Sequence, residues 1–261
     1  MGTGVLVIKL DDCIPFMNAL SQLSNISNKA DVKVSPFSFS VITTHPHLGF
    51  TATLNFSPQR FAVYAVDQYY SFSISLQFFH NAMSQFGQAQ DLPSLCITAL
   101  LLEPTKTIIL NFTSPTRRRE ANGVATTWLT SLPSEEKELG AIDYGKYFTI
   151  HSEDLRRVIN LLDVLVCVTV TNSEVRFHTT SQMVVVTKKG GGCEIVGYEE
   201  EIFGNQFKII LRPSTFFCRL SYNETERVSF YQTINNTHHV VLFPVFADSL
   251  SPQYAIYFPV M

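Results

Sequence analysis

The sequence has no long apolar run and no excess of positive charge. The apolar run near its start, residues 5–8, is far shorter than the roughly 18 residues of a membrane span, so neither a signal peptide nor a transmembrane helix is expected. Lys and Arg number 19 against 22 Asp and Glu. The sequence therefore predicts no membrane role, and any contact with nucleic acid must come from a local basic patch.

Cysteine is scarce and follows no disulfide pattern. The five cysteines are widely separated and lie mostly in apolar surroundings, which favours reduced buried thiols and a cytosolic or nuclear location. Five N-x-Ser/Thr sequons, by contrast, are typical of a glycosylated surface protein. They begin at Asn25, Asn55, Asn111, Asn223 and Asn235. Because Asn, Ser and Thr are abundant and no signal peptide is expected, chance occurrence is favoured.

Motifs that carry chemistry are also missing. Residues 190–192 are three consecutive glycines, but no GKS/T pattern follows, so a strand connection is favoured over a phosphate-binding loop. His45 with His47, and His238 with His239, lack Cys or carboxylate companions at ligand spacing. No cysteine is placed for nucleophilic catalysis. We expect no enzyme activity, no metal and no cofactor.

Strand patterns dominate what is present. Hydrophobic residues make up 46% of the chain, which is enough for one or two buried cores. Short runs of β-branched and aromatic residues alternate with polar ones between Asn, Gly, Pro and Ser. Strands are predicted at residues 4–9, 31–34, 38–44, 50–56, 69–74, 95–102, 107–113, 124–129, 146–150, 164–171, 174–180, 183–187, 206–210, 228–233, 240–246 and 254–258.

Four windows have the 3.6-residue period of a helix: residues 13–23, 76–86, 154–162 and 213–220. Ser152 is the N-cap candidate of the third, and Pro213 suits the first turn of the fourth. The helices recur every 60 to 75 residues or so, each followed by strands, which indicates an internal repeat. The polar segment 131–144 reads as a connector, so we predict an N-terminal domain at 1–130 and a C-terminal domain at 145–261.

The sequence resembles the sliding-clamp family represented by proliferating cell nuclear antigen. The resemblance lies in the repeated order of helices and strands, in the connector at 131–144 and in the C-terminal segment. The most specific part is the C-terminal run, Phe246-Ala247-Asp248 followed by residues 254–261, YAIYFPVM. The resemblance extends over essentially the whole chain. It implies an α+β fold of two similar domains, each with two helices on an inner face and antiparallel sheets outside.

The resemblance also implies a function, that of a non-catalytic ring subunit around duplex DNA. Segments 30–36 and 56–61 resemble subunits of the heterotrimeric DNA-damage checkpoint clamp more than the replicative clamp. The long phosphorylated tail of that clamp's largest subunit has no counterpart here, so the particular subunit stays open. Implied partners are double-stranded DNA, two further clamp subunits in a trimeric ring, a clamp loader and peptide-motif partners such as polymerases and repair factors, all in the nucleus.

The resemblance assigns roles to particular residues. Arg156, Arg157, Arg212 and Arg219 would face DNA, against the alternative of ordinary exposed helix faces. Subunits would join by sheet extension through segments 123–129 and 182–188, with contacts from Val124, Thr126, Trp128, Met183, Val185 and Thr187; Trp128 could instead fill the first core. Partner peptides would dock at Leu132, Leu139, Ile142, Tyr257, Phe258, Pro259 and Val260, which could instead pack on the chain's own sheet.

Three functional alternatives remain beside the checkpoint clamp. One is a replicative homotrimeric processivity clamp. The others have no DNA role: a secreted or surface β-sandwich, which the sequons favour, and a scaffold-like structural β-rich protein. The first helices bear on the choice, because Asn18, Ser21 and Gln22 stand where a replicative clamp usually carries lysines. DNA contact is therefore expected to be stronger on the second domain.

Overall fold

The structure is a computed structural model of the chain. It describes residues 6–11, 14–77, 81, 94–102, 105–113, 123–129, 139–162, 165–198, 205–221, 227–244 and 253–260, with the backbone alone at residues 14, 94–102, 105–113, 123–129 and 244. No helix in this part of the chain is both long and apolar enough to cross a membrane.

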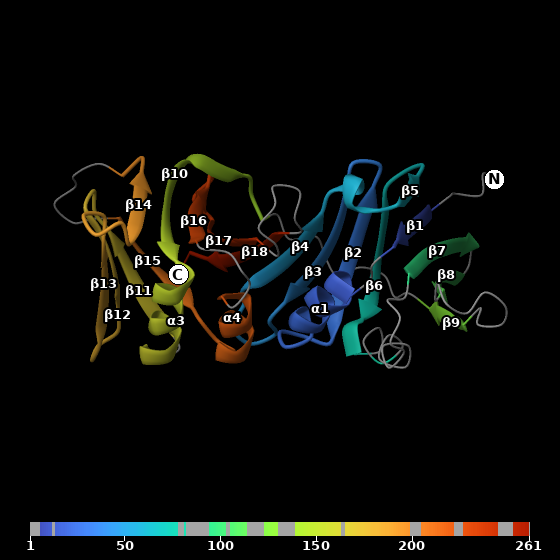
Figure 1. Ribbon diagram of the computed structural model, residues 1–261, viewed down its shortest axis with the longest axis horizontal. Coiled ribbons are helices and arrows are strands. Elements are labelled where there is room, and N and C mark those ends of the chain that lie inside the picture. Colours follow the sequence, from blue (N-terminus) through green and yellow to red (C-terminus); the bar gives the residue numbers. More distant parts are fainter. Residues whose placement is uncertain are drawn as a thin grey trace. The chain divides into compact units, whose positions relative to one another are not determined.

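Strands outnumber helices in the described ranges (Figure 1). The helices are α1 (Ile14–Leu23), the 3-10 turn η1 (Pro58–Arg60), α3 (Ser152–Leu161) and α4 (Ser214–Ser221). The strands are β1 (Leu6–Leu10), β2 (Lys29–Ser35), β3 (Ser38–Thr44), β4 (Thr51–Phe56), β5 (Val63–Val66), β6 (Tyr70–Ser75), β7 (Ser94–Leu102), β8 (Thr105–Thr113), β9 (Gly123–Leu129), β10 (Ile142–His151), β11 (Leu165–Val170), β12 (Glu174–His178), β13 (Met183–Thr187), β14 (Cys193–Val196), β15 (Asn205–Ile210), β16 (Arg227–Thr233), β17 (His238–Pro244) and β18 (Gln253–Pro259).

The chain divides into two compact units. Unit 1 comprises Met1–Thr43 and Leu54–Glu136, and unit 2 comprises Thr44–Thr53 and Lys137–Met261. The main division, between Glu136 and Lys137, falls inside the segment predicted as a connector. Assignment of Thr44–Thr53 to unit 2 differs from the predicted division. The reason is aromatic packing, because Phe50 contacts the rings of Phe217 and Phe258 at centroid distances of 5.8 and 5.7 Å.

Unit 1 contains antiparallel strands in the orders β5-β1-β7-β8-β9 and β4-β3-β2-β6. Alternate residues of β2 and β3 are buried, as the period-2 pattern of these strands predicts. The helix α1 contributes Phe16, whose ring lies 5.8 Å from that of Phe39 on β3 and 5.1 Å from that of Phe56 on β4. This aromatic contact fixes the buried face of α1 against the sheet.

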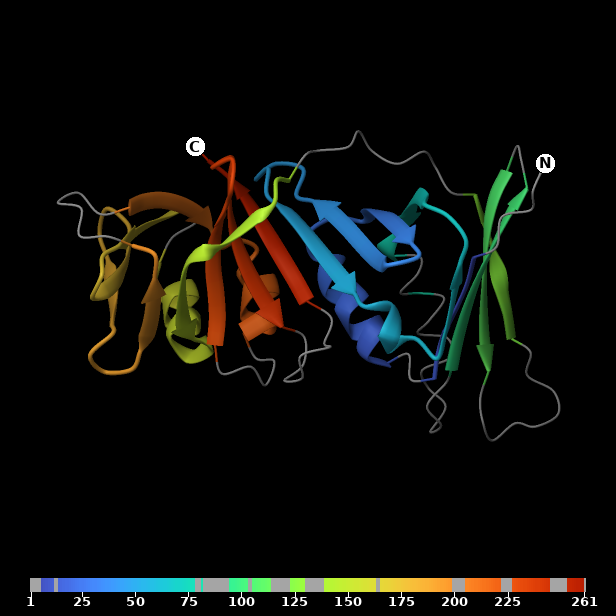
Figure 2. The same cartoon turned by 90° about the horizontal axis from the view of Figure 1, so that it is seen from above.

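Unit 2 has two antiparallel sheets whose inner faces share one core. The strand orders are β14-β10-β16-β17-β18 and β13-β12-β11-β15. Phe148 on β10 stacks on Phe230 of β16 at 4.5 Å, and both rings contact Phe177 of β12 in the other sheet, at 6.3 and 6.0 Å. The helices α3 and α4 lie side by side in this unit (Figures 1 and 2).

The predicted elements correspond closely to those observed. Helices α1, α3 and α4 lie within about one or two residues of the predicted windows, and sixteen predicted strands correspond to described strands. Two short strands were missed, β5 and β14, because four residues carry too little periodicity. Of the predicted helix at 76–86, only Leu76, Gln77 and Asn81 are described. The predicted α+β fold dominated by antiparallel sheet is confirmed.

Candidate DNA-contact and partner-docking surfaces

The helix α3 separates apolar from charged residues. Leu155, Val158 and Ile159 recur at three- and four-residue intervals and are buried, while Arg157 is exposed on the opposite side. Glu153 and Asp154 lie in the first turn, where the helix dipole favours acidic groups. The predicted N-cap was wrong by one residue.

The N-cap position of α3 belongs to His151, which makes no side-chain capping bond. Strand β10 continues up to His151, so Ser152 is already the first helical residue and is buried. Continuity of the strand therefore outweighs the usual preference of Ser for the cap.

The helix α4 begins after Pro213, whose carbonyl oxygen accepts hydrogen bonds from the backbone N–H groups of Phe216 and Phe217 at 3.1 and 3.4 Å. Phe216, Phe217 and Leu220 are buried, and Arg219 is exposed in the last turn, where the dipole favours a cation. Phe217 contacts the rings of Phe243 on β17 and Phe258 on β18 at 6.5 and 6.1 Å. The buried face thus holds Arg219 toward solvent.

Helices α3 and α4 contact each other through Cys218 and Asn160, with the thiol 3.8 Å from the amide oxygen. Burial raises the pKa of the Cys218 thiol, and the charges of Arg156 and Arg212 act in the opposite direction. The two guanidinium groups are therefore close enough to influence one sulfur atom. Arg156 belongs to α3, and Arg212 lies two residues before α4.

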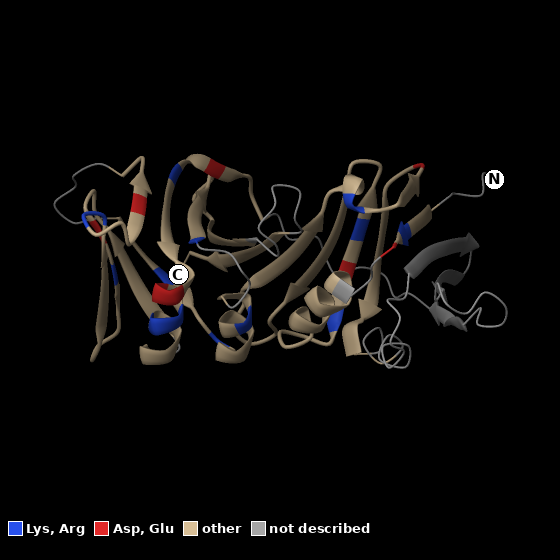
Figure 3. Ribbon diagram, viewed as in Figure 1, with Lys and Arg blue, Asp and Glu red and all other residues tan. Residues whose placement is uncertain are grey.

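Four predicted arginines thus lie on the α3–α4 layer, with Arg156 and Arg212 half-buried and Arg157 and Arg219 exposed. Figure 3 marks basic positions on both helices in blue and the acidic first turn of α3 in red. Asp154 lies 3.2 Å from the guanidinium of Arg157 and partly neutralises it. We call Arg156, Arg157, Arg212 and Arg219 the arginine face; two carboxylates, Glu153 and Asp154, oppose its four positive charges.

Sequence reasoning missed three members of this layer. Asp154, Asn160 and Cys218 were given no role in the sequence analysis, although Asp154 pairs with Arg157 and the other two join the helices. The i,i+3 spacing of Asp154 and Arg157 was the available signal. No sequence pattern predicts the Asn160–Cys218 contact, because it depends on tertiary packing.

The two segments predicted to join subunits are both terminal strands of their sheets. β9 ends the order β5-β1-β7-β8-β9, and β13 begins the order β13-β12-β11-β15. On β13, Met183, Val185 and Thr187 point to solvent, with Met183 61% and Val185 39% exposed. The β9 backbone is described, but the side chains of Val124, Thr126 and Trp128 lie outside the described residues.

Two of the predicted docking residues, Ile142 and Tyr257, lie on one face of the β10-β16-β17-β18 sheet. A buried cluster of Val240, Leu242 and Ala255 is flanked by the half-buried Ile142, Tyr231 and Tyr257. The strand register places Val196, Tyr147, Tyr231, Val240 and Tyr257 in one row across five strands. An apolar band therefore crosses this face.

The predicted residues contribute to that band unequally. Leu139, Ile142, Tyr257 and Pro259 are half-buried and Val260 is exposed, so their apolar atoms reach the surface. Phe258 has 0% exposure and points into the core, against Phe50 and Phe217, so it supports the face from beneath. Leu132 lies outside the described residues.

The histidine pairs show no metal-binding geometry. His45 and His47 lie in the turn between β3 and β4, with ring centroids 6.2 Å apart, and the side chain of His239 is buried against Phe207. Among the described residues, no group of three or more His, Cys, Asp or Glu side chains is arranged to hold a metal ion. The glycines at 190–192 connect β13 and β14, in keeping with a strand connection.

Comparison with known proteins identifies the fold. No protein-family model and no curated protein matches the sequence. Among solved structures, the chain is similar to one described as a PCNA2-PCNA3 complex from Sulfolobus tokodaii, with a TM-score of 0.69 and 8% sequence identity over 97% of this chain and 98% of that chain. The chain therefore has the PCNA-like sliding-clamp fold over nearly its full length.

Proposed function

We propose that this chain is a non-catalytic subunit of a DNA sliding clamp, a ring that encircles duplex DNA and docks other proteins. The observation that carries the proposal is the arginine face on two packed helices within a sliding-clamp fold. Guanidinium groups attract phosphates without reading bases, which suits a protein that must move along DNA. The local patch also explains how a chain with a formal charge of -3 binds DNA.

The ring forms by pairing of β9 of one subunit with β13 of the next. Both are terminal strands, and neither contains a charged residue that would oppose pairing with another strand. The related structure is itself a complex of two clamp subunits, which supports partners of the same kind. The assembly is a trimer with two further clamp subunits, opened by a clamp loader.

Partner proteins dock by a peptide motif on the apolar band beside β18. Leu139, Ile142, Tyr257, Pro259 and Val260 supply its accessible apolar atoms, and the buried Val240 and Leu242 supply its floor. Apolar side chains at a surface are best explained by a partner that covers them. Polymerases and repair factors are the expected partners.

Within the sliding clamps, the DNA-damage checkpoint clamp of the nucleus is the favoured assignment. Segments 30–36 and 56–61 support it by resemblance, and α1 supports it because Asn18, Ser21 and Gln22 bear no charge. DNA contact then depends mainly on unit 2.

Topological trapping tests the proposal without a loader. The assembly in which the chain purifies is incubated with linear biotinylated duplex DNA, and the DNA ends are then blocked with streptavidin. We expect retention on blocked DNA and release when a restriction enzyme opens one end. Replacing Arg156, Arg157 and Arg219 together with Glu should abolish retention, because repulsion replaces phosphate attraction.

A matched control separates charge from folding. The triple Gln variant should retain weaker binding than the wild type but stronger binding than the Glu variant, with an unchanged circular dichroism spectrum. Retention on open-ended DNA equal to that on blocked DNA, or full retention of the Glu variant, would contradict an encircling ring.

A further inference from the structure

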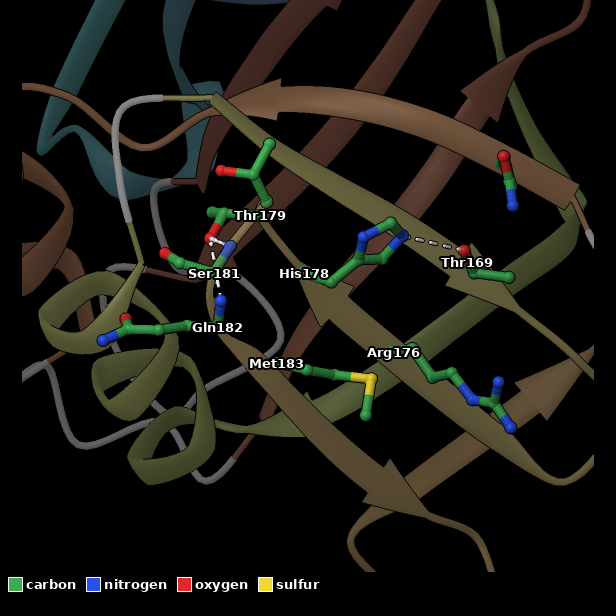
Figure 4. Close-up of a pocket in the computed structure, with 9 residues that line it drawn as sticks. Thr169, Arg176, His178, Thr179, Ser181, Gln182 and Met183 are labelled. Atoms are coloured by element: carbon green, nitrogen blue, oxygen red, sulfur yellow. Dashed lines mark hydrogen bonds between the residues drawn. The ribbon is translucent and has the colours of Figure 1, made fainter.

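A solvent-facing pocket lies on the β13-β12-β11-β15 sheet of unit 2 (Figure 4). Its volume is about 450 Å³, and it is open to solvent. The lining residues are Thr169, Arg176, His178, Thr179, Thr180, Ser181, Gln182, Met183 and Gln206. None of them belongs to the arginine face or to the apolar band, but Gln182 and Met183 belong to the segment predicted to join subunits.

Strand alternation places these side chains on one surface. On β12, Val175 and Phe177 are buried, so Glu174, Arg176 and His178 point the other way. The register then sets Thr169 beside Arg176 and Met183 beside His178, and Gln206 of β15 lies next to Thr169. Three strands and one turn therefore present polar groups to the same space.

The pocket is rich in hydrogen-bond donors and has no carboxylate in its lining. The ring Nε2 of His178 lies 3.5 Å from the hydroxyl of Thr169, and Figure 4 shows the ring turned toward it. The Thr179 hydroxyl accepts the backbone N–H groups of Ser181 and Gln182 at 3.4 and 3.3 Å, which fixes the turn at this end. The turn itself adds the hydroxyl groups of Thr180 and Ser181.

One guanidinium lines the pocket, and one lysine lies farther away on the same sheet. Arg176 lines the pocket, and its Nε and Nη2 contact the carboxylate of Glu174. This contact orients the guanidinium, but the carboxylate also competes with an anionic ligand for the guanidinium N–H groups. Lys208 lies in the same row as Cys167 and His178, two strands from His178, or about 10 Å at the usual strand spacing. A ligand with negative charge is favoured.

We propose that this pocket binds the phosphate group of a phosphoserine or phosphothreonine in a segment of a partner protein. Donors converge from several directions, which suits a phosphate with three terminal oxygens better than a planar carboxylate. A guanidinium is also the side chain best fitted to bind a phosphate. The open, polar lining differs from the enclosed apolar sites that bury small metabolites, so the phosphate belongs to a protein side chain.

The inference concerns another ligand than the DNA-clamp proposal, although two of the pocket residues, Gln182 and Met183, also belong to the segment proposed to pair with the next subunit. The test is a two-dimensional NMR titration of the isotope-labelled protein with N-acetyl-phosphoserine-N-methylamide, the matching glutamate compound and inorganic phosphate. We expect saturable shifts of the Thr169, Ser181 and Gln182 amides with the phosphoserine compound, weaker binding of inorganic phosphate, and no saturation with the glutamate compound.

Variants test the assigned roles. Arg176→Gln should weaken phosphoserine binding by at least about tenfold, the usual effect of losing a charge-assisted hydrogen bond. Glu174→Gln should tighten it severalfold by removing the competing carboxylate. Lys29→Gln makes the same charge change as Arg176→Gln but lies on β2 of unit 1, so it should leave binding unchanged.

Several results would overturn the inference. The inference fails if the glutamate compound binds as tightly as the phosphoserine compound, or if inorganic phosphate binds more tightly than the phosphoserine compound. It also fails if Arg176→Gln binds the phosphoserine compound as tightly as the wild type does, or if no saturable shifts are seen. Circular dichroism of Arg176→Gln checks the fold; the side chain it replaces is about half exposed and lies outside the core. Arg176 and Glu174 lie on β12, outside the arginine face and outside the proposed pairing strand β13, so phosphoserine binding and DNA trapping can fail separately in these variants.

Discussion

His239 is a buried side chain whose protonation the fold opposes. Its ring stacks on Phe207 at 4.1 Å, and its Nδ1 has no hydrogen-bond partner among the described residues. Burial, followed by the charges of His238 and Lys146, lowers the pKa of His239 from 6.5 to about 4. The unfolded chain therefore binds a proton at pH values at which the folded chain does not.

We predict that unit 2 loses stability as the pH falls from about 6.5 toward 4. With the pKa at about 4 in the folded state and 6.5 in the unfolded state, the loss should reach about 2 kcal/mol by pH 5. Urea denaturation at pH 7 and pH 5, followed by circular dichroism, measures it. His239→Leu has no titrating group at this position and should show a clearly smaller difference; an equal difference in both proteins would exclude His239 as the cause.

Asp154 reduces the positive charge of the arginine face. Its carboxylate lies 3.2 Å from Arg157, and Asp154→Asn removes that negative charge while preserving the shape of the side chain. We predict severalfold tighter binding to duplex DNA at low salt, measured by fluorescence anisotropy. Glu194→Gln, on β14, makes the same charge change away from α3 and α4 and should have no effect. If DNA affinity increased equally in both variants, the increase would reflect net charge and not the position of Asp154.

At the scale of elements, β13 is a five-residue strand that contributes side chains to the core and also ends its sheet. Val184 and Val186 are buried, whereas Met183, Val185 and Thr187 are exposed on a strand with one described sheet neighbour, β12. Alternation makes both possible, because successive side chains point to opposite faces. Edge pairing can thus be altered without disturbing the core.

We predict that Val185→Glu prevents ring assembly and leaves the subunit folded. A charge on an edge strand opposes pairing with a second strand, and Val185 is 39% exposed, so the core is unaffected. Size-exclusion chromatography with light scattering should show a lower mass than for the wild type. Val185→Thr, which keeps a β-branched side chain, should assemble normally. Normal assembly of Val185→Glu would place the subunit interface elsewhere.

At the scale of the whole molecule, the chain is nearly neutral, yet three arginines lie on the helices α3 and α4 and a fourth, Arg212, lies two residues before α4. Neutralising a DNA phosphate releases counterions, and this release makes affinity depend on salt. A net charge near zero is therefore compatible with the proposed DNA binding. The distribution of charge over the fold is the relevant quantity.

We predict that Arg219→Gln lowers the slope of log K against log salt by about 0.9 for each DNA phosphate that the variant no longer neutralises. Affinities for one duplex are measured by anisotropy between low and near-physiological salt. Lys29→Gln changes the net charge equally, and it should leave the slope unchanged because Lys29 lies on β2 of unit 1. An unchanged slope for Arg219→Gln would remove this residue from the DNA-binding surface.

Sixteen of the described strands, the helices α1, α3 and α4, and a connector within which the two units divide could be predicted from the sequence. Local rules suffice there: alternation sets the buried side of each strand, and the spacing of Leu155, Val158 and Ile159 leaves Arg157 exposed. Which distant residues meet could not be predicted in this way. The tertiary structure brought Thr44–Thr53 to unit 2, joined Cys218 to Asn160, buried Phe258 and gathered the donors around His178. These contacts join residues far apart in the sequence, and only packing of the sheets and helices fixes them, because no local periodicity records which faces will meet.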